Sequence, residues 1–150
     1  MIYRMGAALM SLLGLFVSAY LYLYKIGRIG TLACGTGGCE TVQTSEWSRF
    51  LGVEVALIGV LGYAALLLVA LLALRPAYTE RREPALALAA LAAGGVLFTI
   101  YLTSLELFVI HAICRWCVGS AAIIVTILIL SLLELKRVGT TAPVRVAGTR

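Results

Sequence analysis

The sequence predicts an all-α integral membrane protein, a bundle of four transmembrane helices with a long outer loop that carries a short amphipathic helix. The 150 residues are 62% apolar and only 13% charged, and their mean hydropathy is +1.04. Such a chain has too few polar side chains to cover a water-soluble globule. Four long apolar runs approach the roughly 20 residues that a helix needs to cross the hydrocarbon core. Because backbone groups in lipid must bond to one another, each run is expected to be helical.

The first two predicted spans cover residues 5–24 and 55–74, and neither contains a charged residue. Arg4 precedes the first run, so this run could instead be a cleavable secretory signal. It is long, however, and it lacks a clear cleavage site of small residues. We therefore expect it to remain as a membrane span.

The third and fourth predicted spans cover residues 85–105 and 116–133. Together with the first two they define a transmembrane domain over residues 1–138. The remaining residues, 139–150, are small, polar and basic, and we expect a disordered tail without a function of its own.

Positive charge is distributed unequally between the two sides of the predicted bundle. Four spans place both termini and the loop 75–84 on one side, and the loops 25–54 and 111–115 on the other. The first side holds Arg4, Arg75, Arg81, Arg82, Lys136, Arg137, Arg145 and Arg150, whereas the second holds Lys25, Arg28, Arg49 and Arg115. This asymmetry predicts a multi-pass protein of the cell membrane with both termini in the cytoplasm. The net charge of +5 is therefore an orientation signal, and it does not indicate nucleic-acid binding.

This orientation places all four cysteines at the extracytoplasmic face, where disulfides persist. Cys114 and Cys117 form a CxxC motif at a predicted helix N-terminus. The helix dipole and the charge of Arg115 should lower the pKa of one of these thiols and make it nucleophilic. Cys34 and Cys39 flank a glycine-rich loop, which could carry one cysteine between different partners.

Two interpretations of the cysteines remain open. A mobile pair beside a helical pair can relay electrons by thiol–disulfide exchange. Alternatively, the protein is not catalytic, and the cysteines form static disulfides or one zinc site. The four-residue gap between Cys34 and Cys39 is wider than the CxxC knuckles of most structural zinc sites, which favours the relay.

The segment 45–52 predicts the short amphipathic helix of the outer loop. Trp47, Phe50 and Leu51 fall on one helical face, and Ser45 is placed to act as the N-cap. The aromatic side chains could cover a binding pocket or dip into the lipid headgroups.

The order of these motifs resembles the vitamin K epoxide reductase family. The resemblance rests on the run from Cys39 to Gly52 (CETVQTSEWSRFLG), on Gly59 and Tyr63 in the second span, and on the CxxC motif that opens the fourth. It covers about residues 5 to 135. It implies a prokaryotic homologue without a fused thioredoxin-like domain. Such a protein would oxidise a separate thioredoxin-like dithiol protein on the outer side and reduce a membrane quinone of the menaquinone or ubiquinone type, without a metal.

The resemblance also implies a role for each cysteine. Cys117 would lie next to the quinone, with Cys114 as its disulfide partner. Cys39 would attack the Cys114 side of that bond, and Cys34 would exchange with the external dithiol protein.

The residues expected to bind the quinone are Cys117, Ser45, Trp47, Gly59 and Glu106. Glu106 lies within the apolar end of the third span, where an ionisable group is a functional candidate, although it could also reach headgroup water.

Two positions depart from the pattern of the vertebrate members. Val55 stands where an asparagine is expected, and Ala121 stands where a tyrosine is expected. Both departures argue against epoxide reduction and favour an ordinary quinone in an apolar pocket. The disulfide bond protein B family is a further four-span alternative, but its CxxC motif lies in the first outer loop, the reverse of the order here.

Overall fold

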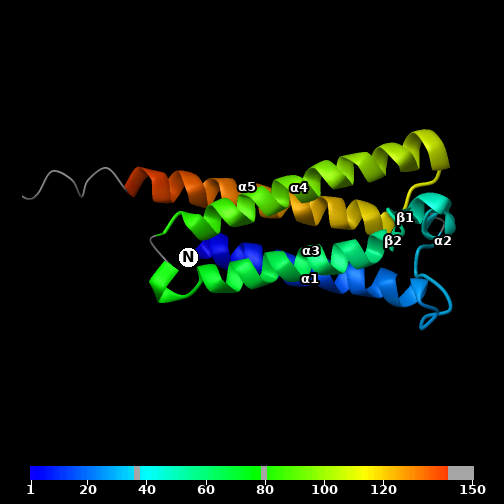
Figure 1. Cartoon of the computed structure of the whole chain (residues 1–150), viewed down its shortest axis with the longest axis horizontal. Helices are drawn as coiled ribbons and strands as arrows, with labels where there is room; N and C mark the ends of the chain where they lie inside the picture. Colours follow the sequence, from blue (N-terminus) through cyan, green and yellow to red (C-terminus); the bar gives the residue numbers. More distant parts are fainter. Residues whose placement is uncertain (36–37, 79–80, 142–150) are drawn as a thin grey trace, which may run out of the picture.

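The computed structural model describes residues 1–35, 38–78 and 81–141 (Figure 1). In these residues four helices are long and apolar enough to cross a membrane, and this confirms the predicted fold. They are α1 (Ile2–Lys25), α3 (Val55–Ala73), α4 (Glu83–Leu105) and α5 (Arg115–Thr141). The short elements are α2 (Cys39–Thr44), the 3₁₀ turns η1 (Glu46–Ser48) and η2 (Pro76–Tyr78), the strands β1 (Arg49–Phe50) and β2 (Val53–Glu54), and the π-helical turn η3 (Glu106–Ile110).

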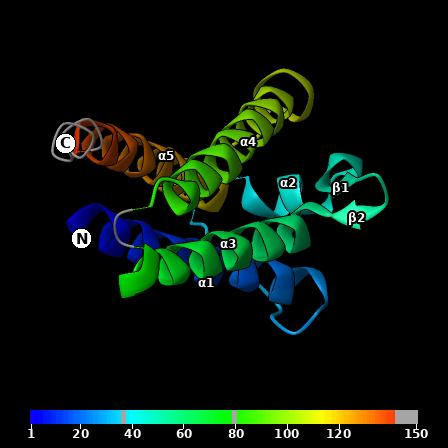
Figure 2. The same ribbon diagram turned by 60° about the vertical axis from the view of Figure 1, so that its left-hand side comes forward.

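The four long helices run side by side along the longest axis of the molecule (Figure 1). We call the end that contains Met1 and residues 74–78 and 81–82 the terminal end, and the end that contains residues 26–35, 38–54 and 106–117 the cysteine end. Helix α1 packs against α3 and α5, while α4 packs mainly against α5. Toward the cysteine end, α4 leans away from α1 and α3 (Figure 2).

A central contact joins three of the helices. The Tyr63 hydroxyl on α3 donates to the carbonyl oxygen of Ser120 on α5 at 2.9 Å and lies 2.8 Å from the Ser120 hydroxyl. The Tyr63 ring lies directly against Gly14 of α1, where any added Cβ would overlap it. Only glycine allows α1 to approach this ring so closely.

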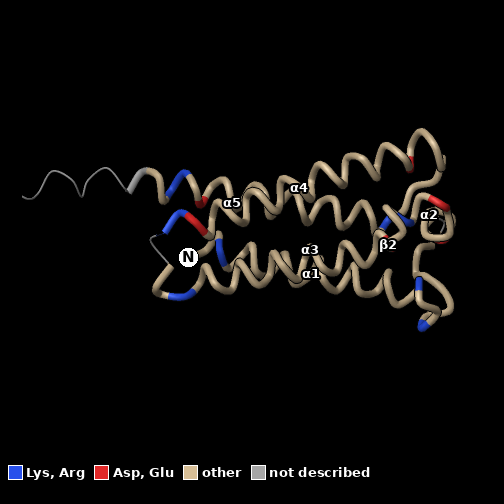
Figure 3. Tube along the Cα trace, viewed as in Figure 1, with Lys and Arg blue, Asp and Glu red and all other residues tan. Residues whose placement is uncertain are grey.

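Charged side chains gather at the two ends of the bundle and leave the middle apolar (Figure 3). Arg4 is a buried exception at the terminal end. Its Nε bonds to Oε1 of Glu134 on α5 at 2.8 Å, and the two side chains are only 2% and 6% exposed. Its Nη1 donates to the carbonyl oxygens of Ala73 and Tyr78. Arg4 thus joins α1 to α5, to the last turn of α3 and to the loop that follows.

The predicted amphipathic helix over residues 45–52 is wrong. These residues form η1 and then an antiparallel hairpin in which Arg49 pairs with Glu54 and Phe50 with Val53. The two-residue turn has φ of 51° at Leu51 and 83° at Gly52, the backbone of a tight hairpin turn. The short helix of the outer loop is α2 instead, directly after the glycine-rich loop.

The predicted boundary of the tail also needs correction. Helix α5 continues through Thr141, so residues 139–141 are helical, and only residues 142–150 of the predicted tail lie outside the described part of the chain.

We expect the Arg4→Met substitution to lower the free energy of unfolding by about 3–5 kcal/mol, because it leaves the Glu134 carboxylate buried without its ion-pair partner. The measurement is equilibrium unfolding in mixed detergent micelles. The Arg81→Met variant serves as the control, since the Arg81–Glu83 pair is exposed and its atoms are 3.9 Å apart. Equal stability of the two variants would contradict a stabilising role for Arg4.

Candidate functional site

The four cysteines meet at the cysteine end of the bundle. Cys34 and Cys39 are joined by a disulfide, whereas Cys114 and Cys117 are free thiols. Cys39 and Cys114 are both fully buried, and with Cys34 they belong to one apolar cluster against which Cys117 packs. The structure therefore brings together all four predicted redox residues.

A backbone contact holds the two cysteine pairs side by side. The Gly38 N–H donates to the carbonyl oxygen of Ile113 at 3.1 Å, which joins the residue before Cys39 to the residue before Cys114. A Cβ at Gly38 would lie only 2.7 Å from the Ala112 Cβ. Since real Cβ atoms do not approach so closely, this position requires glycine.

Cys114 lies immediately before the first turn of α5, and its Sγ accepts a bond from the Cys117 N–H at 3.3 Å. The hydrogen bond from the Cys117 thiol holds the pKa of Cys114 below its ordinary value, and the backbone N–H groups of Cys117 and Trp116 lower it further, although burial opposes them. This confirms a lowered pKa in the CxxC motif. The groups that stabilise the Cys114 thiolate are these hydrogen-bond donors. The Arg115 guanidinium, which was expected to do so, extends instead toward Gly35 in the loop of Cys34.

A largely apolar cavity of about 310 Å³ lies beside Cys117, between the four long helices. Of the predicted quinone-binding residues, Cys117, Gly59 and Glu106 line it. Gly59 also allows close helix packing, because a Cβ there would lie 2.8 Å from the Ser18 hydroxyl of α1. The polar and ionisable lining residues are Ser18, Gln43, Tyr63, Thr99, Thr103, Glu106, Cys117 and Ser120.

The other two predicted pocket residues, Ser45 and Trp47, line a smaller adjoining cavity of about 40 Å³. Glu106 and Cys117 line both cavities. The expected N-cap role of Ser45 is wrong, because its hydroxyl donates to the Val42 carbonyl oxygen at 2.7 Å and makes no capping bond to η1.

Lys25, at the end of α1, fastens the outer loop over the cavities. Its Nζ bonds to the Gln43 carbonyl oxygen, lies 2.6 Å from the Ser48 hydroxyl, and pairs with Glu54 at 3.3 Å. Burial opposes ionisation of Glu54, but bonds from Arg49 and Lys25 hold the pKa of its carboxyl below the ordinary value. Glu54 is therefore ionised at physiological pH, and its ion pair with Lys25 holds the outer loop against the end of α1.

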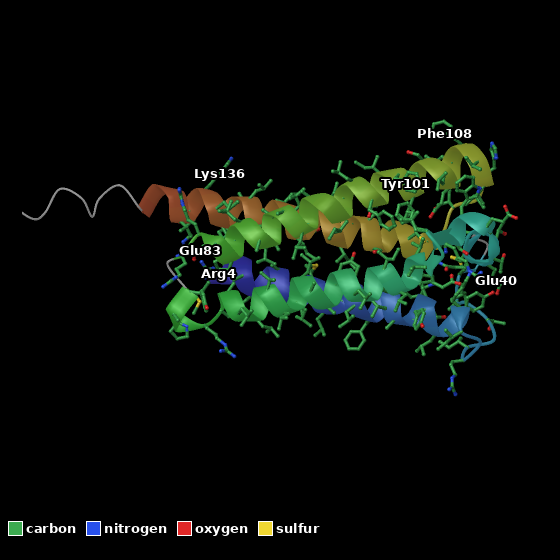
Figure 4. All side chains as sticks on the ribbon, viewed as in Figure 1. Arg4, Glu40, Glu83, Tyr101, Phe108 and Lys136 are labelled. Carbon is green, nitrogen blue, oxygen red and sulfur yellow. A yellow bond between two sulfur atoms is a disulfide. The ribbon has the colours of Figure 1, made fainter. Side chains whose placement is uncertain are left out.

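The hairpin packs against α4 through aromatic rings. The Phe50 ring lies 5.4 Å from that of Phe98 and 6.0 Å from that of Tyr101, both at a steep angle. Tyr101 projects from α4 at the cysteine half of the bundle (Figure 4). Phe98 lines the larger cavity, so the hairpin packs against a residue of the cavity wall.

Glu106 is buried beside the helical cysteine pair. Glu106 is only 5% exposed, and its Oε2 accepts a hydrogen bond from the Cys114 N–H at 3.1 Å. It also shares a hydrogen bond with the Cys117 thiol. It begins the π-helical turn η3, and His111, which follows this turn, has a φ of 55°. The exposed His111 ring contacts the Val109 carbonyl oxygen at 3.2 Å.

Sequence reasoning missed Gln43, which is 8% exposed and lines both cavities. Its only sequence signal was its place in the run after Cys39. In residues 1–35, 38–78 and 81–141, no three His, Cys, Asp or Glu side chains are arranged to hold a metal ion.

The fold and site define a multi-pass membrane protein in which two cysteine pairs adjoin each other and one of them, through Cys117, lines an apolar cavity. Residues 6–132 match the family model described as the Vitamin K epoxide reductase family. The chain belongs to that family, whose members are membrane oxidoreductases of disulfide and quinone chemistry.

We expect Gly38→Ala to separate the two cysteine pairs, because its methyl group would collide with Ala112. In a Cys34→Ala, Cys117→Ala background only Cys39 and Cys114 can join, and mild oxidation should link them. Gly38→Ala should slow this crosslink about tenfold, the equivalent of about 1.4 kcal/mol of overpacking. The measurement is crosslink yield against time by mass spectrometry.

The matched control is Gly30→Ala in the same loop, where an added Cβ meets nothing within 4 Å. Equal crosslinking rates in the Gly38→Ala and Gly30→Ala variants would contradict the contact.

We expect Cys117→Ala to raise the pKa of Cys114, because the thiol that donates to its sulfur is lost. Cys114 should then become a thiolate only at higher pH, whereas Cys117→Ser, which keeps a donor, should titrate nearer the parent. Thiolate ultraviolet absorbance against pH measures this in a chain with Cys34 and Cys39 replaced by serine. Identical titrations of the Ala and Ser variants would show that the side-chain donor does not matter.

Proposed function

We propose that this protein is a quinone-dependent thiol–disulfide oxidoreductase that promotes disulfide formation in a separate thioredoxin-like protein. The observation that carries the proposal is the contact of the two cysteine pairs beside the apolar cavity that Cys117 lines. A relay needs its second pair within reach of the first and its last sulfur open to the acceptor.

Electrons enter at the loop pair. A thiolate of the partner attacks Cys34 and releases Cys39 as a thiolate. Cys39 attacks Sγ of Cys114 in a Cys114–Cys117 disulfide, and Cys117 leaves with the electron pair. The second thiolate of the partner frees Cys34, which leaves the partner oxidised. Cys34 then attacks Cys39 and releases Cys114. The lowered pKa of Cys114 suits this step, because a thiol of low pKa leaves faster.

The larger cavity fits the head of a membrane quinone of the menaquinone or ubiquinone type. Its volume of about 310 Å³ and mostly apolar lining are those of a small-molecule site with a few orienting polar groups. Cys117, Gly59 and Glu106 would hold the ring, with Ser45 and Trp47 at the adjoining cavity. A bound quinone would supply a two-electron, two-proton acceptor. Val55 in the cavity wall brings no amide to grip an epoxide, so we favour ordinary quinone reduction.

We propose that the cysteine end faces outward and that both termini are cytoplasmic. The support is the distribution of positive charge, with four Lys and Arg residues on the loops of the cysteine end and eight on the other side. A thioredoxin-like partner would then meet Cys34 in an oxidising compartment.

The test follows quinone absorbance after reduced thioredoxin-like protein is added to the full chain in detergent. The wild type and the Gly30→Ala control should reduce quinone. Cys117→Ala should abolish reduction, and Cys34→Ala should block it while quinone still binds, because the first lacks the last sulfur and the second lacks the entry sulfur.

Normal turnover by Cys34→Ala would contradict the assigned order. A wild type that reduces none of several quinones, with cysteines that are unreactive or hold zinc, would favour the structural interpretation instead.

A further inference from the structure

Glu106 is the one carboxyl group in contact with the helical cysteines in the described residues. All seven acidic residues of the chain are glutamates, and of the described ones Arg4 engages Glu134 and both Lys25 and Arg49 engage Glu54. The partners of Glu106 are instead the Cys114 N–H and the Cys117 thiol. Among the described residues, no Lys, Arg or His side chain forms an ion pair with Glu106.

The position of Glu106 between the two cavities suits proton movement. Cys117 lines both cavities together with Glu106, and the smaller cavity is also lined by Ser45, Ser48 and Trp47, of which Trp47 is 47% exposed. A cavity of about 40 Å³ with hydroxyl neighbours has room for a water molecule. Glu106 thus lies beside the reacting sulfur and beside a cavity that is lined by two hydroxyl groups and by an exposed residue of the loop.

We propose that Glu106 is the catalytic base that takes the proton of the Cys117 thiol and passes it to the quinone. This inference rests on the proposed function. It adds the acid–base chemistry that the four cysteines cannot supply alone.

The proton balance requires such a group. Oxidation of the Cys114 and Cys117 thiols to a disulfide releases two electrons and two protons, and conversion of a quinone to a hydroquinone takes up two of each. The first proton moves from Sγ of Cys117 to the Glu106 carboxylate and then to a quinone oxygen, while the electron pair on sulfur goes to the quinone. The second proton leaves Cys114 as its sulfur bonds to Cys117 and goes to the other quinone oxygen, and Glu106 is ionised again at the end.

The groups that face Glu106 set the expected pH dependence. These are Cys114, directly before α5, and Cys117 within it, while α2 and α3 contribute the uncharged Gln43 and Val55 at the shared cavity wall. A carboxylate base works only while it is ionised. The rate of Cys117 reactions should therefore rise with pH and level off once Glu106 is ionised, before the ordinary range of a free thiol.

The experiment uses the full chain with Cys34 and Cys39 replaced by serine and Cys114 by alanine, so that only Cys117 reacts. The probe is N-ethylmaleimide, a small apolar electrophile, and mass spectrometry gives the alkylation rate against pH without any quinone. Glu106→Gln keeps an acceptor for the backbone N–H at position 114 but cannot take a proton. We expect it to react about 100-fold more slowly at neutral pH, with a rate that climbs steadily with pH and shows no plateau.

Two further variants separate a proton role from a structural one. Glu46→Gln, which removes an exposed carboxyl group from the outer loop, should match the parent. Glu106→Asp should be slower but should keep the plateau. A Glu106→Gln profile like that of the parent overturns the proposal. So does a parent without a plateau, even if Glu106→Gln does not fold.

Quinone assays then distinguish this inference from the function on which it rests. With wild type active, Glu106→Gln should slow quinone reduction about as much as alkylation. A wild type that reduces no quinone would defeat the proposed function, while the maleimide profile would still report whether Glu106 serves Cys117 as a base.

Discussion

The backbone hydrogen bond between Gly38 and Ile113 joins two loops that the sequence keeps far apart, and the arrangement of the cysteine end depends on it. It brings the start of α2 against the start of α5, so that Cys39 and Cys114 share one buried cluster. The Ala112 side chain leaves no room for a Cβ at position 38, so this contact requires glycine there. The outer loop is then held by the Lys25–Glu54 ion pair and by the packing of Phe50 against α4.

The bundle buries polar groups for different purposes at its two ends. At the terminal end, Arg4 and Glu134 satisfy each other and bind the end of α3, an arrangement that gives a single packing of three helices. At the cysteine end, Glu106 is equally buried but bonds to a thiol and to a backbone N–H. A buried charge with a cation beside it is held in place, whereas a buried carboxyl group beside a thiol can exchange a proton.

The sequence predicts the helices better than the details of the site. Long charge-free runs identify all four spans because the hydrocarbon core imposes length and apolarity together. The hairpin was missed because Trp47, Phe50 and Leu51 also fit a helical spacing, whereas the turn at Leu51 and Gly52 is specified by only two residues. The π-helical turn at Glu106 has no recognisable sequence signal, and the contact of Gly38 with Ala112 is purely tertiary. The family resemblance predicts that the four cysteines act together. Gln43 is identified as a cavity residue only by the packing of the folded chain.

The short spacing of the loop cysteines has a consequence for how the protein is made. Cys34 and Cys39 are five positions apart and lie in the loop that follows the first helix, so their bond can close within a small loop of a chain still being synthesised. Cys114 leaves the ribosome after two further helices. During biogenesis the loop cysteines can therefore pair with each other before the rival sulfurs exist, and the sequence order itself guards the nascent chain against a scrambled disulfide.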